Sequence, residues 1–332
     1  MRVLITGGSG FIGRYLAQEA RERGHDVVAT YLAGAELETR PPPPTGVRWE
    51  QLDVRDRVDV DRLVETVRPD AVFHLAAQAY AAKAWQAPAE TFDTNVAGTI
   101  HLYEALRRSP AREGVFLASS AAAYGTTERL PTTEEAPLRP VNPYGVSKAC
   151  QDMLSWQYST NFGMRIVRGR LFITTGPGKT GDALNDFAQR VARLERARAP
   201  GKLRVGNLDV RRDISDVRDV VRAIWTVFER GEPKQPINIG AGESFSIREV
   251  AELLVRAADV PIELERDPEL LRPTDEPDIR SDISRLRALG YSPTIPIDRT
   301  AKDSLDHWRE FLPEQGSESA PAPANSGNPA FR

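Results

Sequence analysis

The chain has 332 residues, of which 40% are apolar and 27% charged, and its net charge at pH 7 is −3. This length suits one large α/β unit or two closely joined domains with a sizeable core. The slightly acidic balance argues against a general nucleic-acid-binding protein, which usually carries a basic domain. The single cysteine, Cys150, excludes an internal disulfide framework and a cysteine-rich zinc site.

Other simple features narrow the class further. The four histidines are scattered along the chain and do not favour a metal centre, so no metal is expected. No apolar run approaches the ~18 residues that a membrane-spanning helix needs. The first six residues lead directly into glycines, without the charged and apolar regions of a signal peptide. We therefore expect a cytoplasmic protein with no membrane contact.

Short apolar runs alternate with helical patterns through the first half of the chain. The expected strands lie at residues 3–5, 27–29, 71–75 and 114–118, and the expected helices at residues 12–23, 62–67 and 91–107. Continuous apolar strands separated by helices are typical of a parallel sheet that is covered on both faces. The pattern predicts an α/β fold of Rossmann type, a doubly wound parallel sheet, with a dinucleotide-binding domain over residues 1–170.

The alternation of apolar strands and helical patterns becomes less regular after about residue 170. We interpret residues 171–312 mainly as a smaller C-terminal α/β lobe that binds substrate, with a helix at about 214–230 returning to the first domain. The lobe includes a strand at residues 237–240 and a helix that Ser246 and Glu249 open as a capping box. The stretch 313–332 contains no Val, Ile or Leu, so we expect it to be a disordered tail.

A glycine-rich segment connects the first expected strand to the first expected helix. It reads Gly7-Gly8-Ser9-Gly10-Phe11-Ile12-Gly13. Glycines at these positions allow a tight turn, let backbone N–H groups approach a pyrophosphate and let the helix pack closely on the strand. The positive end of the helix dipole would then face the phosphates. The segment predicts a dinucleotide site.

The residues that would select between NAD and NADP are less decisive. The strand at 27–29 is followed by Thr30-Tyr31-Leu32, without the acidic residue that binds the ribose hydroxyls of NAD. Arg14 or Arg40 could contact an NADP phosphate, although each also fits a solvated surface arginine. We expect NADP(H) or NAD(H), with NADP(H) favoured.

An acidic residue further along could also serve the cofactor. Asp53 follows the apolar Leu52 and precedes Val54. It would lie at a strand end near the adenine, or it would cap the next helix.

The segment Asn142-Pro143-Tyr144-Gly145-Val146-Ser147-Lys148 carries the clearest chemistry. Asn142 is a good N-cap and Pro143 a good first helical residue. Tyr144 and Lys148 are then four residues apart on one helix face. An ammonium group beside a phenol lowers the phenol pKa from ~10, which makes the tyrosine a usable proton donor.

A serine pair precedes this helix in the chain. Ser119 and Ser120 follow the expected strand at 114–118, so they would lie at the carboxyl edge of the sheet, where open α/β folds bind ligands. Ser120 could donate a hydrogen bond to a carbonyl oxygen, or it could simply end the strand in a turn.

These motifs together resemble the extended short-chain dehydrogenase/reductase family, in its nucleotide-sugar branch, over about residues 1–312. The resemblance also includes His74-Leu75-Ala76-Ala77, Thr94-Asn95-Val96-Ala97-Gly98-Thr99, Tyr124-Gly125 and Gly176-Pro177-Gly178. It implies that Ser120, Tyr144 and Lys148 are catalytic and that Asn95 supports the active site. The implied cofactor-binding residues are Gly7, Gly10, Phe11, Ile12, Gly13, Asp53, Val54, Leu75, Ala76, Ala77, Asn95, Tyr144 and Lys148.

The second half is similar to enzymes that act on GDP-mannose derivatives. The similar segments are residues 206–213, which include Asn207 and Arg212, and residues 271–275, which include Arg272 and Asp275. The resemblance implies that these four residues and Ser120 bind the substrate, with Arg212 gripping the diphosphate. The eight basic residues between positions 190 and 212 support an anionic ligand. Ile173 replaces an asparagine of the family pattern, so the exact sugar stays open.

The resemblance implies an oxidoreductase that reduces the 4-keto group of a GDP-linked 6-deoxyhexose with NAD(P)H. It also implies a homodimer packed through the helices at 91–107 and 144–162. An epimerase, a 4,6-dehydratase and a non-catalytic dinucleotide sensor remain alternatives. Residues 121–123 are alanines where related dehydratases carry an acid, and Glu134 and Glu135 are expected to be solvated in a proline-flanked loop.

Overall fold

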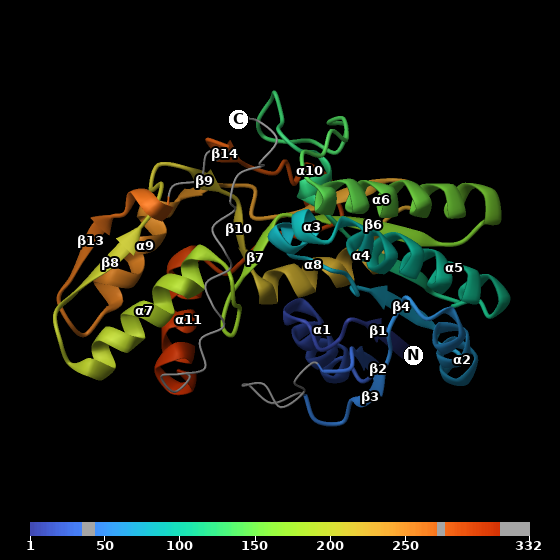
Figure 1. Cartoon of the computed structure of the whole chain (residues 1–332). Coiled ribbons are helices and arrows are strands. Elements are labelled where there is room, and N and C mark those ends of the chain that lie inside the picture. The colour runs from blue at the N-terminus through green and yellow to red at the C-terminus, as the bar shows by residue number, and fades with distance from the viewer. Residues whose placement is uncertain (35–43, 271–275, 313–332) are drawn as a thin grey trace. The chain divides into compact units, whose positions relative to one another are not determined.

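Figure 1 shows the computed structural model, which describes residues 1–34, 44–270 and 276–312. The chain forms two compact units. The first contains residues 1–172, 220–239 and 282–292, and the second contains the described parts of 173–219, 240–281 and 293–332. Arg40, Arg272, Asp275 and the predicted tail at 313–332 lie outside the described residues.

A seven-stranded parallel sheet forms the centre of the first unit. Its strands, in sheet order, are β11 (Pro236–Ile239), β6 (Ile166–Leu171), β5 (Gly114–Ser120), β4 (Ala71–His74), β1 (Arg2–Thr6), β2 (Asp26–Tyr31) and β3 (Arg48–Gln51). In the register, Leu4 pairs with Val28 on one side and with Val72 on the other. The predicted Rossmann-type fold is confirmed, and each predicted strand of the first half is present. The strand predicted at residues 237–240 is β11, which pairs with β6 in this sheet and therefore belongs to the first unit and not to the C-terminal lobe.

Helices cover both faces of this sheet (Figure 1). On one face, α2 (Arg57–Val67), α5 (Gly98–Arg108) and α6 (Pro143–Phe162) bury side chains in a core with Leu4, Val72 and Leu117. On the other face lie α1 (Phe11–Glu22) and α8 (Val217–Arg230), whose Trp225 ring centroid is 4.7 Å from that of Phe73. Short elements complete the unit: α3 (Ala81–Gln86), α4 (Pro88–Phe92), η2 (Ala121–Ala123) and α10 (Ser284–Ala288).

The helix predicted at residues 91–107 is confirmed, but it contains a π-helical turn. It consists of α4, a π-helical turn η1 (Asp93–Ala97) and α5. The turn places the Asn95 side chain in the interior, where it is fully buried. Helical periodicity alone does not reveal such a turn, because its cause is a set of tertiary hydrogen bonds to Asn95 that are described below.

The second unit is built from small sheets and three longer helices. Its strands are β7 (Ile173–Thr175) with β10 (Ile214–Asp216), β8 (Gly201–Val205) with β13 (Ile262–Arg266), and β9 (Arg211–Arg212) between β12 (Phe245–Ser246) and β14 (Asp278–Ile279). The helices α7 (Ala183–Ala197), α9 (Ile247–Ala257) and α11 (Ile297–Phe311) share one apolar core, and η3 (Pro268–Leu270) is a short turn. The predicted capping box of Ser246 and Glu249 is confirmed at the start of α9.

No helix in the described part of the chain is long and apolar enough to cross a membrane.

Candidate active site

The glycine-rich loop between β1 and α1 is tightly packed. Gly7 has φ +71°, and a Cβ atom on it would lie 2.7 Å from the backbone nitrogen of Ala76. A Cβ atom on Gly13 would lie 2.4 Å from the carbonyl oxygen of Gly7. Both positions therefore require glycine. The close approach brings the loop against residues 75–77, so two segments that were predicted to bind the cofactor are neighbours.

The start of α1 fits an anionic group. Gly10 is the N-cap, no side chain of the described residues caps this end, and the first turn contains no acidic residue. The first amides of a helix have no partner within the helix, and the dipole makes this end positive. The residues present thus fit the pyrophosphate of a dinucleotide.

Two side chains form hydrogen bonds with the glycine-rich loop. Thr30, at the end of β2, accepts a hydrogen bond from the Gly7 amide through its Oγ1 at 3.1 Å. Arg14 is half-buried, and its Nε donates to the Ser9 carbonyl at 3.0 Å, so it is not simply a solvated arginine.

Asp53 follows β3 and does not cap α2. Its carboxylate pairs with the Arg55 guanidinium, with an Nη2–Oδ2 distance of 2.6 Å, and this hydrogen bonding lowers the pKa of Asp53. Asp56 is the residue that caps α2. Val54 is buried beside Gly98, the first residue of α5.

The predicted start of α6 is confirmed. Asn142 is the N-cap and accepts from the Gly145 amide at 2.8 Å, and Pro143 is the first helical residue. These residues place Tyr144 and Lys148 on the turns that follow. The Lys148 Nζ lies 6.0 Å from the centroid of the Tyr144 ring.

Ser120 lies beside this pair, at the carboxyl end of β5. Its hydroxyl accepts from the Ala122 amide at 3.2 Å, and its proximity to the Tyr144 hydroxyl lowers the pKa of that group. The Lys148 Nζ donates to the Ala118 carbonyl at 2.8 Å, two residues before Ser120 on the same strand. The structure thus brings Ser120, Tyr144 and Lys148 together.

Burial dominates the electrostatics of this group. It raises the pKa of Tyr144 above its ordinary value, while the hydrogen bond with Ser120 acts in the opposite direction. It also lowers the pKa of Lys148 to about 7. The expectation that lysine lowers the tyrosine pKa is therefore wrong for this structure, because the buried lysine itself loses much of its preference for the charged form.

Asn95 connects the π-helical turn to α6. Its Oδ1 accepts from the Gln78 amide at 2.8 Å, and its Nδ2 donates to the Ser147 Oγ at 2.8 Å and to the Gln78 carbonyl at 3.1 Å. Ser147 in turn donates to the Tyr144 carbonyl at 2.7 Å. Asn95 thus supports the turn of α6 that carries Tyr144 and Lys148.

A second series of buried hydrogen bonds runs from β1 to Asn95 and to α6. Thr99 Oγ1 donates to the Asn95 carbonyl at 2.6 Å and accepts from Gln151 Nε2 at 2.7 Å. The remaining contact of Thr99 is to His74 Nε2 at 2.9 Å, so His74 must donate through Nε2 and accept from Thr6 Oγ1 through Nδ1 at 2.7 Å. Burial lowers the pKa of His74 to about 3, which keeps the ring neutral.

Sequence reasoning did not assign roles to Thr6, His74, Gln78 or Ser147. The available signal was the polar His74 at the end of an otherwise apolar strand. Such a residue needs buried hydrogen-bond partners, and the structure shows that they lead to Asn95.

The predicted substrate residues that the structure describes belong to the second unit. Asn207 is half-buried, and its Oδ1 accepts from the Asp209 amide at 3.1 Å. Arg212, on β9, donates through Nη1 to the carbonyls of Arg211 and Glu276 at 2.8 and 2.7 Å.

Two residues of the basic stretch at 190–212 have acidic partners elsewhere in the chain. Lys202 pairs with Glu265 at 2.7 Å, and Arg204 pairs with Asp267 and Glu269. The count of charges along the sequence thus overstated the free positive charge.

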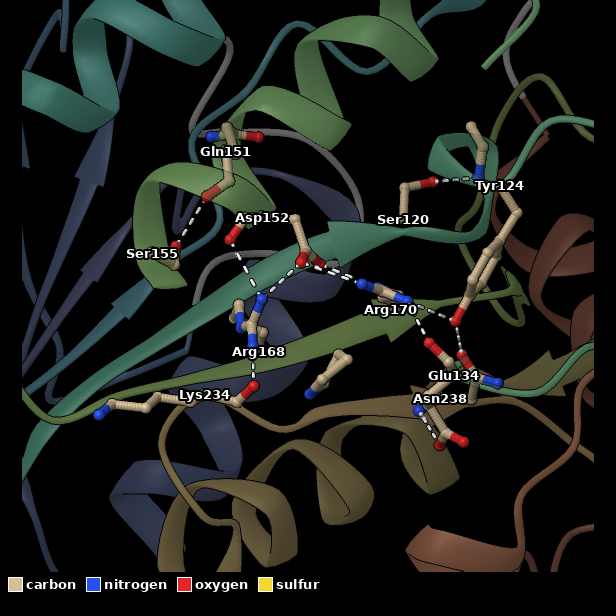
Figure 2. Close-up of polar contacts among 12 residues, drawn as sticks. Ser120, Tyr124, Glu134, Gln151, Asp152, Ser155, Arg168, Arg170, Lys234 and Asn238 are labelled. Carbon is tan, nitrogen blue, oxygen red and sulfur yellow. Dashed lines mark hydrogen bonds and ion pairs between the residues drawn. The ribbon is translucent and has the colours of Figure 1, made fainter. Parts of the chain in front are cut away.

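Glu134 is not solvated, contrary to the prediction. Its side chain is buried, its Oε1 accepts from the Asn238 amide at 2.9 Å, and burial raises its pKa. Glu135 is exposed and pairs with Arg285. In Figure 2 the Glu134 carboxylate lies beside Asn238, across the Tyr124 ring from Ser120.

Comparisons with known proteins show the family to which the chain belongs. The family model described as GDP-mannose 4,6 dehydratase matches residues 4–304. GDP-6-deoxy-D-mannose reductase of Pseudomonas aeruginosa is 32% identical over 319 residues, which cover 95% of this chain and 99% of that protein.

Solved structures agree as well. RMD from Pseudomonas aeruginosa complexed with NADPH matches with a TM-score of 0.79 at 31% identity, covering 94% of this chain and 99% of that one. UDP-glucose 4-epimerase of Thermus thermophilus in complex with NAD matches with a TM-score of 0.82 at 30% identity, covering 93% and 99%. The chain therefore belongs to the GDP-mannose 4,6 dehydratase family, within the nucleotide-sugar branch of the extended short-chain dehydrogenases/reductases.

Proposed function

We propose that this protein reduces the 4-keto group of a GDP-linked 6-deoxyhexose. The observation that carries the proposal is the grouping of Ser120 at the end of β5 with Tyr144 and Lys148 at the start of α6, in the same unit as the glycine-rich loop. A non-catalytic dinucleotide sensor would have no use for a proton donor held in this way.

The proposed mechanism assigns one task to each side chain. A bound nicotinamide cofactor supplies the hydride for the keto carbon. Ser120 donates a hydrogen bond to the keto oxygen and so polarises the carbonyl. Tyr144 gives its hydroxyl proton to the oxygen as negative charge develops on it. Lys148, with a pKa of about 7, can hold or release a proton near neutral pH and thus restore the tyrosine.

The cofactor site supports NADP(H) as the preferred form. The end of β2 presents Thr30 and Tyr31, where an acidic residue would favour the free ribose of NAD. Arg14 lies at the glycine-rich loop through its bond to Ser9, and a guanidinium there could pair with a phosphate. Asp53, Val54, Leu75, Ala76, Ala77 and Asn95 are the other proposed cofactor contacts.

The second unit would supply the substrate contacts. Asn207 and Arg212 are proposed to bind the GDP portion, and by resemblance Arg272 and Asp275 hold the ribose. Arginine suits a diphosphate because its guanidinium can donate two parallel hydrogen bonds. Residues 1–170 and 171–312 thus divide between dinucleotide and substrate binding in this proposal, with the helix at 214–230 returning to the first part.

Dehydration of the sugar needs acid and base groups near the substrate. Ala121, Ala122 and Ala123 carry only methyl groups where a proton donor would be needed. Glu134 is engaged by the Asn238 amide. These contacts favour reduction over 4,6-dehydration.

The decisive experiment is turnover with defined substrates. We expect GDP-4-keto-6-deoxymannose and NADPH to give a product that has gained one hydride and one proton, with one cofactor oxidised per product and NADH less effective. A product of unchanged mass without net oxidation of cofactor would identify an epimerase and overturn the proposal. Loss of water from GDP-mannose with oxidised cofactor would identify a dehydratase and overturn it too.

We also propose a cytoplasmic homodimer formed through α6 and the neighbouring segment of α4, η1 and α5. The support for the dimer is a set of exposed apolar side chains on α6, namely Val146, Met153 and Trp156. The support for the cytoplasm is that the one cysteine forms no disulfide within the chain.

A further inference from the structure

A buried network of charged and polar side chains joins α6 to two strands of the parallel sheet, β6 and β11. Asp152, one turn after Lys148 on α6, accepts from Arg168 Nη1 at 2.7 Å and from Arg170 Nε and Nη2 at 2.9 and 3.0 Å. Both arginines lie on β6, and all three side chains are almost fully buried. Figure 2 shows the two guanidinium groups converging on the one carboxylate.

The two arginines differ in what they contact beyond Asp152. Arg170 donates through Nη1 to the Tyr124 hydroxyl at 2.9 Å and to the Glu134 carbonyl at 3.0 Å. The Tyr124 hydroxyl then donates to Asn238 Oδ1 on β11 at 2.7 Å. Arg168 donates instead to the Lys234 carbonyl. Thus Arg170 connects Asp152 to the segment that follows β5, whereas Arg168 connects it to the Lys234 backbone.

Tyr124 follows the short turn η2, and Ser120 is the residue that precedes this turn. The turn η2 separates Ser120 from Tyr124, and its first residue, Ala121, accepts from the Tyr124 amide at 2.9 Å. The turn also contacts α6 directly, because a Cβ atom on Gly145 would lie 2.4 Å from the Ala122 carbonyl oxygen. Ser120 therefore sits between two fixed points, the strand β5 and the anchored Tyr124 ring.

We propose that Arg170 is a positioning residue that fixes the Ser120 hydroxyl relative to the Tyr144 hydroxyl. It contacts the helix that carries Tyr144 through Asp152 and the turn that follows Ser120 through Tyr124. A planar guanidinium with donors on three nitrogens can hold both contacts at once, which a lysine ammonium cannot do in the same geometry. This inference rests on the proposed catalytic role of Ser120 and Tyr144.

The test compares Arg170→Lys with Arg168→Lys. Both variants keep the charge and disturb the same Asp152 carboxylate, but only the first breaks the link to Tyr124. We expect Arg170→Lys to lower kcat for the keto sugar by ~10²-fold, the scale of a small misplacement of reacting groups, with little change in KM for NADPH. Arg168→Lys should lose comparable unfolding stability and keep kcat within about threefold.

The pH profile separates positioning from general destabilisation. The hydrogen bond with Ser120 lowers the pKa of Tyr144, and reduction needs the tyrosine protonated. Weakening that bond should move the alkaline fall of kcat to higher pH in Arg170→Lys and leave it in place in Arg168→Lys.

A milder variant covers the case in which Arg170→Lys does not fold. Tyr124→Phe removes only the hydroxyl link and should lower kcat by ~10-fold with the same shift of the alkaline limb. If Arg170→Lys or Tyr124→Phe keeps the wild-type kcat and pH profile, the positioning role is wrong. If Tyr144→Phe turns over normally in this assay, the proposed function itself fails, and the two failures are thus distinguishable.

Discussion

Tyr144 is the residue on which the proposed chemistry most depends. Tyr144→Phe removes one hydroxyl and keeps the ring, so the fold should persist. We expect kcat to fall by ~10²–10⁴-fold, the usual contribution of a positioned proton donor, while NADPH still binds. Steady-state kinetics and cofactor titration by fluorescence measure the two quantities.

Tyr158→Phe provides a matched control on the same helix. The Tyr158 hydroxyl donates to Glu104 at 2.7 Å, and no residue assigned to the proposed site contacts it among the described hydrogen bonds. This variant should keep its kcat. Equal activity of the two variants would remove Tyr144 from the mechanism.

Lys148 should make folding stability depend on pH in a defined direction. Its pKa in the folded protein is about 7, whereas the pKa of a lysine in the unfolded chain is near 10.5. Between these values the unfolded chain binds more protons, so rising pH stabilises the folded state. From pH 7.5 to 9, the unfolding free energy of the wild type should rise by ~2 kcal/mol relative to Lys148→Met.

Urea unfolding at several pH values measures this difference. Lys302→Met replaces an exposed lysine on α11 in the same way and is the control. A constant difference between the wild type and Lys148→Met over this range would contradict the low pKa of the buried lysine.

The sequence predicts the locally determined residues well. Asn142, Pro143, Tyr144 and Lys148 follow from one segment, because cap preference and helical spacing are short-range properties. The partners that tune them are long-range and were not predicted. A recognisable signal was the alternation of Arg168 and Arg170 in an otherwise apolar strand, since buried arginines require a buried acid, but the pattern does not say that the acid is Asp152.

At the scale of the elements, one buried carboxylate forms hydrogen bonds with the loops beside the strands β9, β12 and β14. Asp213, the residue after β9, accepts from the amides of Ala241 and Ser281 at 2.7 and 2.9 Å, from the Gly242 amide at 3.2 Å and from the Ser281 hydroxyl. The residue before Asp213 is Arg212, the last residue of β9 and the proposed phosphate ligand. The carboxylate thus fixes the loops on both sides of that arginine.

Asp213→Asn tests this clamp. An amide presents an NH₂ group to at least one of these donors, so a buried pair is lost, at a cost of at least about 2 kcal/mol. We expect lower stability in urea and faster amide hydrogen exchange in residues 240–242. Asp209→Asn, at an exposed residue 3.4 Å from Arg248, should cost at most about 1 kcal/mol. Similar losses in both variants would show that Asp213 is not a clamp.

Element boundaries illustrate the same limit of local patterns. The capping box of α9 is written in adjacent residues and is confirmed. The π-helical turn at Asn95 cannot be predicted from adjacent residues, because Asn95 forms its hydrogen bonds with Gln78 and Ser147, which lie 17 and 52 residues away in the chain. Such turns occur often at functional sites, and here the turn supports Tyr144.

At the scale of the whole molecule, α6 has two faces with different tasks. Tyr144 and Lys148 lie on the side that faces β5. Val146, Met153 and Trp156 are 37%, 64% and 50% exposed, and at 100° per residue they lie within one outward sector, roughly opposite Tyr144 and Lys148. An exposed apolar stripe of this kind on a helix that also carries the site favours contact with a second copy.

The dimer can therefore be tested without touching the site. Sedimentation of the wild type should give a mass twice the 36.8 kDa of the chain. The double variant Met153→Glu/Trp156→Glu places like charges across a symmetric interface, where each residue of one copy meets the same patch of the other, and should give a monomer that still binds NADPH. Val58→Glu, at a 71% exposed residue on α2, should remain dimeric. A wild type that sediments as a monomer would contradict the proposed interface. A double variant that stays dimeric would place the interface on another surface. The reason is that glutamates buried in an interface without partners cost several kcal/mol per charge.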